Sequence, residues 1–477
     1  METQPLYLRV AHHYRGAIRS GVLPPGERMP SVRTLTRLHQ VSLSTALQAC
    51  RSLEDEGLLE ARPRSGYFVR PQRRSTLPPV TEPDTSRALA AQYVGMHDRV
   101  SAFVAQSARH AVQTDFAVAY ASPDGYPAEA LKNAAVRALR HHPDLLVNPR
   151  ASPGEPALRA VLARRALEAG MGFSAEDIVV TQGCIEALNI ALRAVARPGD
   201  TIAVESPTFY GLLQVLESLG LQALEIPTSP HTGLSVEALE LALQTHAGIK
   251  AVVVVPNFQN PLACVMPDAH KQRLVALCAR VGVPVIEDDT YGALTDDDVP
   301  LKPVKAWDRE GGVIYCASLR KILAPGMRLG WVSGGRWHAR IQMLKYAQSR
   351  TNEALMQLTT AEFMGSSAYD RHLGRLRRLL HQRREQTADA IARHFPAGTR
   401  LNLPQGSVML WVELPPGCLA QTLFDTALRQ GIRVAPGPLF SNSDRFSHFV
   451  RINAGFPFDA PADQALRVLG GLARQGA

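Results

Sequence analysis

Hydrophobic residues near the N-terminus recur with the period of an α-helix. One face of this predicted helix carries Tyr7, Val10, Ala11, Tyr14, Ala17 and Ile18. The stretch Pro24-Pro25-Gly26 that follows is a strong helix stop. A second helix is predicted to open at Pro30-Ser31, and a third to be capped by Ser42 or Ser44. The apolar stripes are Val32, Leu35 and Leu38 in the second helix and Ala46, Leu47, Cys50 and Leu53 in the third.

The pattern changes between Gly57 and Val69, where apolar and polar residues alternate around a basic turn. This alternation predicts two short strands that form a β-wing. Two short helices joined by a tight turn and followed by a wing form a winged helix-turn-helix, which we place at residues 1–70. From residue 71 onward Pro, Arg, Ser and Thr dominate without an apolar period, so we expect a linker at residues 71–97. A flexible linker of about 25 residues reaches roughly 25–30 Å, and its prolines should stiffen it.

From about Val100 onward, continuous apolar runs alternate with helical stretches. The predicted strands lie at residues 177–180, 201–204, 251–255, 283–286 and 313–315. Uninterrupted apolar strands between helices are typical of a parallel sheet that is buried on both faces. The pattern therefore predicts an α/β fold for residues 98–477.

Length and composition set limits on the class of protein. The 477 residues exceed one hydrophobic core, so we expect two or three domains. No run approaches the roughly 20 apolar residues that span a bilayer, and no signal peptide precedes the first helix, so we expect a cytoplasmic protein without a membrane partner. The six cysteines are scattered without metal-ligand spacing, so we expect neither disulfides nor a bound metal.

The net charge of +9 is concentrated at the N-terminus. Residues 1–74 contain 12 arginines, no lysine and 6 acidic residues. Clustered arginine suits the phosphates and base edges of nucleic acid. A charged patch can equally be a solvated surface, so the charge supports DNA binding only together with the winged-helix pattern.

Polar motifs follow several of the predicted strands of the C-terminal region. Thr181-Gln182-Gly183-Cys184 joins a strand to a helix, whose N-terminal amides can bind an anion. Glu287-Asp288-Asp289 and Asn260-Pro261 each end a strand. Each motif is weak evidence alone, because tight turns favour glycine, a carboxylate at a strand tip can be inert, and Asn-Pro is an ordinary turn.

A serine, a lysine and an arginine occur together as Ser318, Lys321 and Arg328. Pyridoxal phosphate needs a lysine for an imine, a carboxylate for its ring nitrogen, a donor near its ring hydroxylate, an aromatic ring on one face, and a cationic, amide-rich phosphate cup. All five features occur in this chain. The combination predicts a pyridoxal-phosphate site, against the alternative that Lys321 is an ordinary surface lysine.

The N-terminal segment resembles the GntR-type winged helix. The resemblance rests on residues 25–36 (PGERMPSVRTLT), 41–45 (VSLST) and 64–69 (RSGYFV). It implies contacts with a double-stranded DNA operator. The residues that would face the major groove or its phosphates are Arg33, Ser44, Thr45 and Gln48, and those of the wing that would reach the backbone or minor groove are Arg62 and Arg64.

Two residues depart from the GntR pattern. Leu43 stands where the family often has an arginine, so DNA affinity is lower or the operator different. Gln40 replaces the usual turn glycine, which costs roughly 1 kcal/mol if that position requires a positive φ. A module used only for dimerisation or packing remains the alternative to DNA binding.

The C-terminal region resembles the fold-type I aminotransferases. This resemblance implies a large part with a mixed, mostly parallel sheet at about 145–335, and a smaller α+β part at about 336–477 together with the N-terminal segment. It implies that Lys321 forms the internal aldimine and shuttles a substrate proton, and that Asp288 pairs with the pyridinium nitrogen. The other implied cofactor contacts are Tyr291 and Asn260 at the ring hydroxyl, Phe209 on the ring face, and Gly183, Cys184, Ser318 and Arg328 at the phosphate. Arg451 would bind the α-carboxylate of a substrate.

Arg320 departs from the aminotransferase pattern, which has serine or alanine beside the lysine. A second cation at this position should lower the pKa of Lys321 or add a phosphate contact. The identity of the amino donor remains open.

A GntR-type arm joined to an aminotransferase-like domain resembles the MocR-type transcriptional regulators. The resemblance implies a homodimer that senses an amino compound through aldimine chemistry and alters its binding to DNA. A pyridoxal-phosphate-dependent aminotransferase with a vestigial arm is the alternative, and turnover would then be fast rather than slow or absent. A third possibility is a regulator in which the cofactor is purely structural.

Overall fold

The computed structural model describes residues 5–19, 22–24, 26–56, 58–62, 65–70, 77–84, 90–148, 153–297 and 299–476. The chain divides into two compact units, Met1–Ser75 and Thr76–Ala477. Each unit is described by itself. No helix in the described ranges is both long and apolar enough to span a bilayer.

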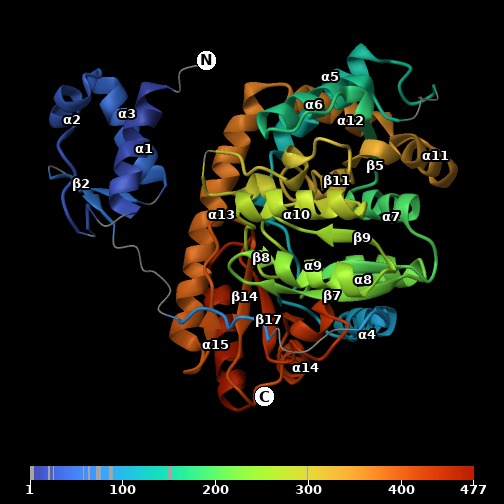
Figure 1. Ribbon diagram of the computed structural model, residues 1–477. Coiled ribbons are helices and arrows are strands. Elements are labelled where there is room, and N and C mark those ends of the chain that lie inside the picture. The colour runs from blue at the N-terminus through green and yellow to red at the C-terminus, as the bar shows by residue number, and fades with distance from the viewer. Residues whose placement is uncertain are drawn as a thin grey trace. The chain divides into compact units, whose positions relative to one another are not determined.

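The N-terminal unit has three helices and a two-stranded wing (Figure 1). The helices are α1 (Leu6–Arg19), α2 (Val32–His39) and α3 (Leu43–Asp55), and the antiparallel strands are β1 (Leu59–Arg62) and β2 (Gly66–Val69). Leu35, Leu53 and Leu59 are the most completely buried of the larger core side chains. The predicted elements are confirmed, except that Leu38 is 63% exposed and does not join the core.

The ends of α2 and α3 are fixed by local hydrogen bonds. The side chain of Ser31 accepts from the backbone N–H of Thr34, and that of Ser42 accepts from the backbone N–H of Thr45. Ser42 rather than Ser44 therefore caps α3. Gln40, at the end of α2, has φ 51° and ψ 45°, so the turn position does require the left-handed conformation.

The predicted linker at 71–97 is too long, because parts of it belong to the C-terminal unit. Val80 is buried, and its backbone N–H donates to Asn402 Oδ1 at 3.0 Å. Thr81 donates to Glu413 through both its backbone N–H and its hydroxyl, at 2.8 Å each. These contacts join one or two polar groups of each residue to distant side chains, so the sequence shows no apolar period over them. Residues 71–76 and 85–89 lie outside the described ranges.

The large sheet of the C-terminal unit has the order β3-β7-β6-β9-β10-β11-β12-β5, with β8 paired to β7. Its strands are β3 (Gln92–Tyr93), β5 (Ile178–Thr181), β6 (Thr201–Ser206), β7 (Gln222–Ser229), β8 (Gly233–Leu234), β9 (Ile249–Val254), β10 (Val285–Asp288), β11 (Val313–Ser318) and β12 (Gly330–Ser333). Neighbours from β7 to β11 are parallel, whereas β12 is antiparallel to both β11 and β5. The sheet is thus mixed and mostly parallel, as predicted.

Helices cover both faces of this sheet. Alternate residues of β9 show the two faces: Val253 packs into the core formed with α7 and α8, while Val252 and Val254 pack into the core formed with α9 and α10. The helices of this part are α4 (Met96–Ala108), α5 (Ala128–His141), α6 (Pro156–Glu168), α7 (Cys184–Val195), α8 (Tyr210–Ser218), α9 (Val236–Thr245), α10 (Asp268–Val281), α11 (His338–Gln348) and α12 (Ala354–Met364). Burial on both faces explains why the strands are continuous apolar runs.

A smaller four-stranded sheet, ordered β13-β14-β17-β16, lies at one end of the C-terminal unit, and α5, α6 and α12 lie at the other (Figure 1). Its strands are β13 (Arg400–Leu401), β14 (Met409–Glu413), β16 (Ala435–Pro436) and β17 (Phe449–Asn453), and its helices are α13 (Ser367–His394), α14 (Ala420–Arg429) and α15 (Ala460–Arg474). A separate pair of short strands, β4 (Thr114–Asp115) and β15 (Ile432–Arg433), joins the N-terminal segment to this smaller part.

Candidate ligand cavity and nucleic-acid interface

The N-terminal half of α3 and the start of α2 carry the residues predicted to contact DNA. Arg33, Ser44 and Gln48 are exposed, and Thr45 is half-buried. The hydroxyls of Ser44 and Thr45 both lie 2.8 Å from the hydroxyl of Ser42. The exposed groups therefore sit on a helix N-terminus whose geometry is already fixed.

The wing carries the other two residues predicted to contact DNA, Arg62 and Arg64. Arg62 on β1 donates to Glu60 at 2.6 Å, and its guanidinium carbon lies 4.3 Å from the centre of the Phe68 ring. The side chain is exposed but already has two partners on the wing. Arg64 lies outside the described residues.

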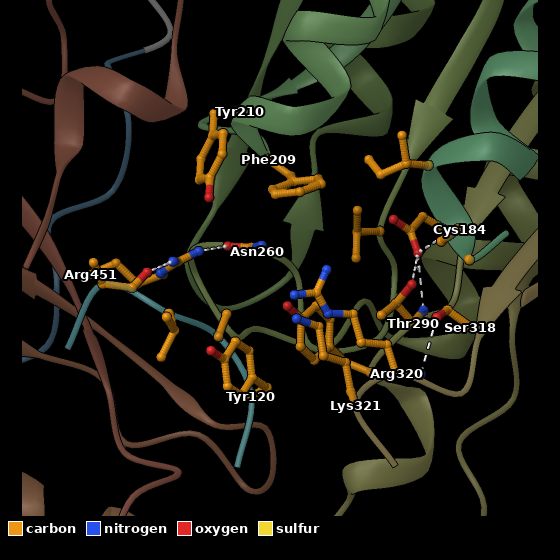
Figure 2. A pocket seen from close by; sticks show the side chains of 18 of the residues that line it. Tyr120, Cys184, Phe209, Tyr210, Asn260, Thr290, Ser318, Arg320, Lys321 and Arg451 are labelled. Atoms are coloured by element: carbon orange, nitrogen blue, oxygen red, sulfur yellow. Dashed lines mark hydrogen bonds between the residues drawn. The ribbon is translucent and has the colours of Figure 1, made fainter. Parts of the chain in front are cut away.

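The C-terminal unit contains a cavity of about 330 Å³ at the ends of its parallel strands (Figure 2). All ten residues predicted from the aminotransferase resemblance line it: Gly183, Cys184, Phe209, Asn260, Asp288, Tyr291, Ser318, Lys321, Arg328 and Arg451. They come from the start of α7, from the ends of β10 and β11, from the middle of β17, and from the connecting loops. The structure therefore brings together residues that are more than 250 positions apart in the sequence.

Lys321 follows β11 and points into the cavity. Its Nζ lies 5.6 Å from the centre of the Tyr120 ring and 5.5 Å from that of Tyr291, and makes no hydrogen bond to a described residue. Burial, together with the nearby cations Arg320 and Arg451, lowers the pKa of this amine to about 7, although Asp288 acts in the opposite direction. Much of Lys321 is therefore the uncharged, nucleophilic amine near neutral pH.

Asp288 ends β10 and presents a carboxylate to the cavity. Its Oδ1 accepts hydrogen bonds from the Thr290 hydroxyl at 2.5 Å, the Thr290 backbone N–H at 3.1 Å and the Cys184 thiol at 3.2 Å. These are its hydrogen bonds to described residues, and none uses Oδ2. Burial raises the pKa of this carboxyl, although the hydrogen bonds from Thr290 and Cys184 lower it. A cation in the cavity would favour the ionised form.

One end of the cavity is built to hold an anion. Gly183, with φ 81°, turns the chain into α7, whose first backbone N–H groups point toward this end. Arg328 is also left-handed, with φ 54°, and donates to the Gln182 carbonyl at 3.3 Å. β12 approaches the turn before α7 closely: a Cβ at Gly330 would lie 2.6 Å from the carbonyl carbon of Gly183. Glycine is therefore required at position 330.

The opposite end of the cavity is formed by Arg451 on β17. This side chain is 1% exposed, and it donates to Asn260 Oδ1 at 2.8 Å and to the Ala117 carbonyl. Burial lowers its pKa, and its Nε has no hydrogen-bond partner among the described residues. A buried guanidinium with an unused donor can bind a carboxylate.

The sequence did not reveal several residues that shape the cavity. Tyr120 lines it from a loop and Tyr210 from the start of α8, and Arg433 lines it while pairing with Asp115. Behind the anion-binding end, Glu186 accepts from the Gln182 backbone N–H at 2.6 Å and forms a buried ion pair with Lys345 at 2.9 Å. The buried positions of Glu186 on α7 and Lys345 on α11 give no local pattern, so only the tertiary contact identifies them.

The two units match two protein families. Residues 6–69 match the model of bacterial regulatory proteins of the gntR family, and residues 120–462 match that of aminotransferase class I and II. The uncharacterized HTH-type transcriptional regulators YjiR and YdcR of Escherichia coli (strain K12) are each 36% identical to this chain. The matches cover 95% of this chain and 95% of YjiR, and 98% of this chain and 99% of YdcR.

Aminotransferases are similar to the C-terminal unit alone. Aromatic-amino-acid aminotransferase 1 of Thermococcus litoralis is 29% identical over 70% of this chain and 81% of its own length. The structure of LysN, an α-aminoadipate aminotransferase from Thermus thermophilus complexed with N-(5'-phosphopyridoxyl)-L-leucine, superposes with a TM-score of 0.72 and 25% identity, covering 78% of this chain and 95% of LysN. Because one chain carries both family domains and its regulator relatives match over nearly their whole length, the protein belongs to the MocR-like HTH-type transcriptional regulators, in which a GntR domain is fused to an aminotransferase class I and II domain.

Proposed function

We propose that this protein is a pyridoxal-phosphate-dependent transcriptional regulator that binds a DNA operator and responds to an amino compound. The observation that carries the proposal is the complete set of ten lining residues in one cavity of a chain that also has a GntR domain. A binding cavity retained in a DNA-binding protein supports ligand-dependent regulation.

The cavity fits pyridoxal phosphate at three points. Lys321 offers a buried amine without a hydrogen-bond partner among the described residues. Asp288 has one carboxylate oxygen, Oδ2, that accepts no hydrogen bond from them. The third point is the anion-binding end, where Arg328 and the N-terminus of α7 suit a phosphate. When bound, the cofactor supplies an aldehyde that condenses reversibly with primary amines.

Each lining residue then has a defined task. Lys321 would hold the cofactor and exchange a proton, and Asp288 would keep a ring nitrogen protonated through an ion pair. Asn260 and Tyr291 would donate to the ring oxygen, while Phe209 would cover one face of the ring. The residues that would bind the phosphate are Gly183, Cys184, Ser318 and Arg328.

Arg451 binds the carboxylate of the incoming amino compound. Because Asn260 and the Ala117 carbonyl already hold this guanidinium, its geometry is preorganised and little side-chain entropy is lost on binding. An amino compound held by Arg451 would contact both parts of the C-terminal unit, because the cavity is lined by residues of the large sheet and by β17. Such a ligand shifts the population of conformations in proportion to its difference in affinity for them.

The DNA-binding residues of the proposal are Arg33, Ser44, Thr45, Gln48, Arg62 and Arg64. Arg33, Ser44 and Gln48 support it by their exposure, because groups that read DNA must be free to reach it. Leu43, 61% exposed at the start of α3, adds an apolar group that suits contact with a thymine methyl group.

We also propose a homodimer. The C-terminal unit exposes large aliphatic side chains on α5 and the turn after it, and they are Val136, Leu139, Leu146 and Val147. Such a patch favours a protein partner, and a two-fold dimer would present two winged helices to two half-sites. Sedimentation that shows a stable, cofactor-loaded monomer would contradict this part of the proposal.

The direct test is binding of the cofactor-loaded protein to a labelled fragment from upstream of its own gene, at fixed salt, with a panel of amino acids and with Arg33→Ala as a control. Specific binding that the control loses and one amino compound alters supports the proposal. If the amino compound changes the cofactor spectrum but leaves DNA affinity, footprint and domain arrangement unchanged, the sensing role is wrong.

An aminotransferase is the second candidate function. Retention of Lys321, Asp288, Tyr291 and Arg451 in one cavity favours it, as does the similarity to Thermococcus litoralis aromatic-amino-acid aminotransferase 1. Repeated turnovers of an amino acid and an oxo acid at about 1 s⁻¹ or faster would establish an enzyme. A single slow half-reaction would favour the regulator.

A further inference from the structure

Arg320 lines the cavity and has no counterion among the described residues. The positively charged side chains that line the cavity are Arg320, Lys321, Arg328, Arg433 and Arg451, whereas Asp288 is its one acidic lining residue within the described chain. Arg433 is neutralised by Asp115. The cavity therefore carries more positive charge than its own residues balance.

The proposed cofactor and carboxylate account for most of this charge. A phosphate would be matched by Arg328 and the N-terminus of α7, a ring nitrogen by Asp288, and an α-carboxylate by Arg451. Lys321 would be the residue that holds the cofactor. Among the lining cations, Arg320 alone is then left without an anionic partner in the described chain.

The surroundings of Arg320 confirm that it is unpaired. Its Nε is buried without a hydrogen-bond partner, and its guanidinium makes no hydrogen bond or ion pair with a described residue. The guanidinium carbon lies 5.7 Å from the centre of the Tyr120 ring, a ring that Lys321 Nζ also approaches at 5.6 Å. An arginine cannot lose its proton to relieve this repulsion, so it needs an anion.

The position of Arg320 distinguishes between two anions. Its backbone N–H donates to Ser318 Oγ at the anion-binding end, but its guanidinium faces Tyr120 instead. Tyr120 belongs to the end formed by β17, because its carbonyl accepts from Asn453 Nδ2 at 3.2 Å. Figure 2 shows Tyr120 and Arg451 on one side of Lys321, and Ser318 and Cys184 on the other. The guanidinium thus lies toward the amino compound rather than toward the phosphate.

We infer that Arg320 is a specificity residue that binds a second anionic group, so that the amino compound is an amino acid with an acidic side chain. Arg451 binds its α-carboxylate and Arg320 its distal carboxylate. This inference rests on the proposed function, because it assumes that the cavity receives an amino compound.

The test compares acidic amino acids with their neutral amides. Cofactor-loaded protein is titrated with L-glutamate against L-glutamine and with L-aspartate against L-asparagine, while the cofactor absorbance is followed. We expect at least one acid to bind about 10- to 100-fold more tightly than its amide, since a charge-assisted contact is lost in the amide. In Arg320→Gln this ratio should fall to near 1, while affinity for the amide and for the cofactor stays within about threefold of wild type.

Two results would overturn the inference. One is equal affinity of the wild-type protein for both acids and their amides. The other is an Arg320→Gln variant that loses cofactor affinity but keeps the acid-to-amide ratio, because the arginine would then bind the phosphate. Failure of the proposed function looks different: the wild-type protein would bind no cofactor, and borohydride would fix none to Lys321.

Discussion

The two units of this chain place their functional groups in opposite environments. In the N-terminal unit Arg33, Ser44 and Gln48 are exposed on short helices around a small core. In the C-terminal unit Asp288 is 7% exposed and Arg451 1% exposed, between two large cores and behind covering loops. One unit carries exposed polar and charged groups on its surface, and the other places charged groups around a cavity.

This difference decides what each substitution costs. An exposed arginine is fully hydrated before it binds, so its removal weakens one contact and leaves folding unchanged. A buried charge depends on its neighbours, as Arg451 depends on Asn260 and Ala117, so its removal leaves unpaired groups behind. The comparison predicts separable effects in the N-terminal unit and linked effects in the C-terminal unit.

The largest effect is expected from Lys321→Ala. The variant should lose all covalent attachment of cofactor, because no other amine in the described part of the cavity can replace it. Its cofactor-free form should also be more stable by about 1–3 kcal/mol near neutral pH, since a buried amine with a lowered pKa opposes folding. Borohydride reduction followed by mass spectrometry, and urea unfolding, measure the two effects.

Lys302→Ala is the matched control, since Lys302 is exposed and lies outside the cavity. It should bind cofactor like the wild type. Cofactor fixed to another lysine in the Lys321→Ala variant would contradict the assignment of the site.

The buried carboxyl of Glu205 should make the stability of the C-terminal unit depend on pH. Burial raises the pKa of this carboxyl to about 8, against the hydrogen bonds from Gln259 and the Val255 backbone that lower it. Between the usual pKa near 4.5 and about 8 the folded state holds a proton that the unfolded state has lost, so stability falls as pH rises through this window. Glu205→Gln should remove this fall and gain about 2–4 kcal/mol on the wild type from pH 5 to pH 8.

Tryptophan fluorescence during urea unfolding measures this effect in the correct unit, because Trp307, Trp331, Trp337 and Trp411 all belong to the C-terminal unit. Glu310→Gln at an exposed position should leave the pH slope unchanged. Equal pH slopes for Glu205→Gln and the wild type would show that Glu205 ionises normally.

Arg33→Ala tests the exposed unit. It should weaken binding to the operator about tenfold and reduce the dependence of log K on log salt by about 1, through loss of one phosphate or base contact. Thermal unfolding should stay the same, because Arg33 has no buried partner. Arg51→Ala, exposed in the C-terminal half of α3, is the control and should change affinity less than threefold, about 0.6 kcal/mol. If Arg33→Ala lost DNA binding because the N-terminal unit unfolded, the expected separation of binding from folding in this unit would be wrong.

Sequence patterns were sufficient to predict elements with a regular hydrophobic period and residues that belong to a known motif. The helix period, the strand runs and the ten lining residues all came from local spacing or resemblance, and the structure brings the ten together. The contacts that fix these residues did not come from spacing. The hydrogen bond from Thr290 to Asp288 and the ion pair of Glu186 with Lys345 depend on tertiary packing alone.

The predicted linker shows that sequence patterns can also miss packing. Proline-rich composition predicted a tether, yet Val80 and Thr81 bond to Asn402 and Glu413, more than 300 residues away. Each of these bonds uses a single backbone N–H, so it requires no periodic pattern of side chains in the sequence. Local composition predicts flexibility correctly only where the segment does not pack against a distant part of the protein.

The smallest effect is expected at Gln40, which shares its backbone conformation with a residue of the other unit. Gln40 has φ 51° and Arg328 φ 54°, and a side chain costs about 1 kcal/mol in this region. Gln40→Gly should stabilise the N-terminal unit by about 0.5–1 kcal/mol without changing DNA affinity, because the Gln40 side chain is exposed. Hydrogen exchange of α2 and α3 peptides in the full chain measures this gain.

Arg328→Gly should relieve the same strain but weaken cofactor binding, because the cation at the phosphate end is lost. If both glycine variants changed stability but neither changed ligand binding, Arg328 would have no role in binding the cofactor. The two units would then not differ at this backbone conformation.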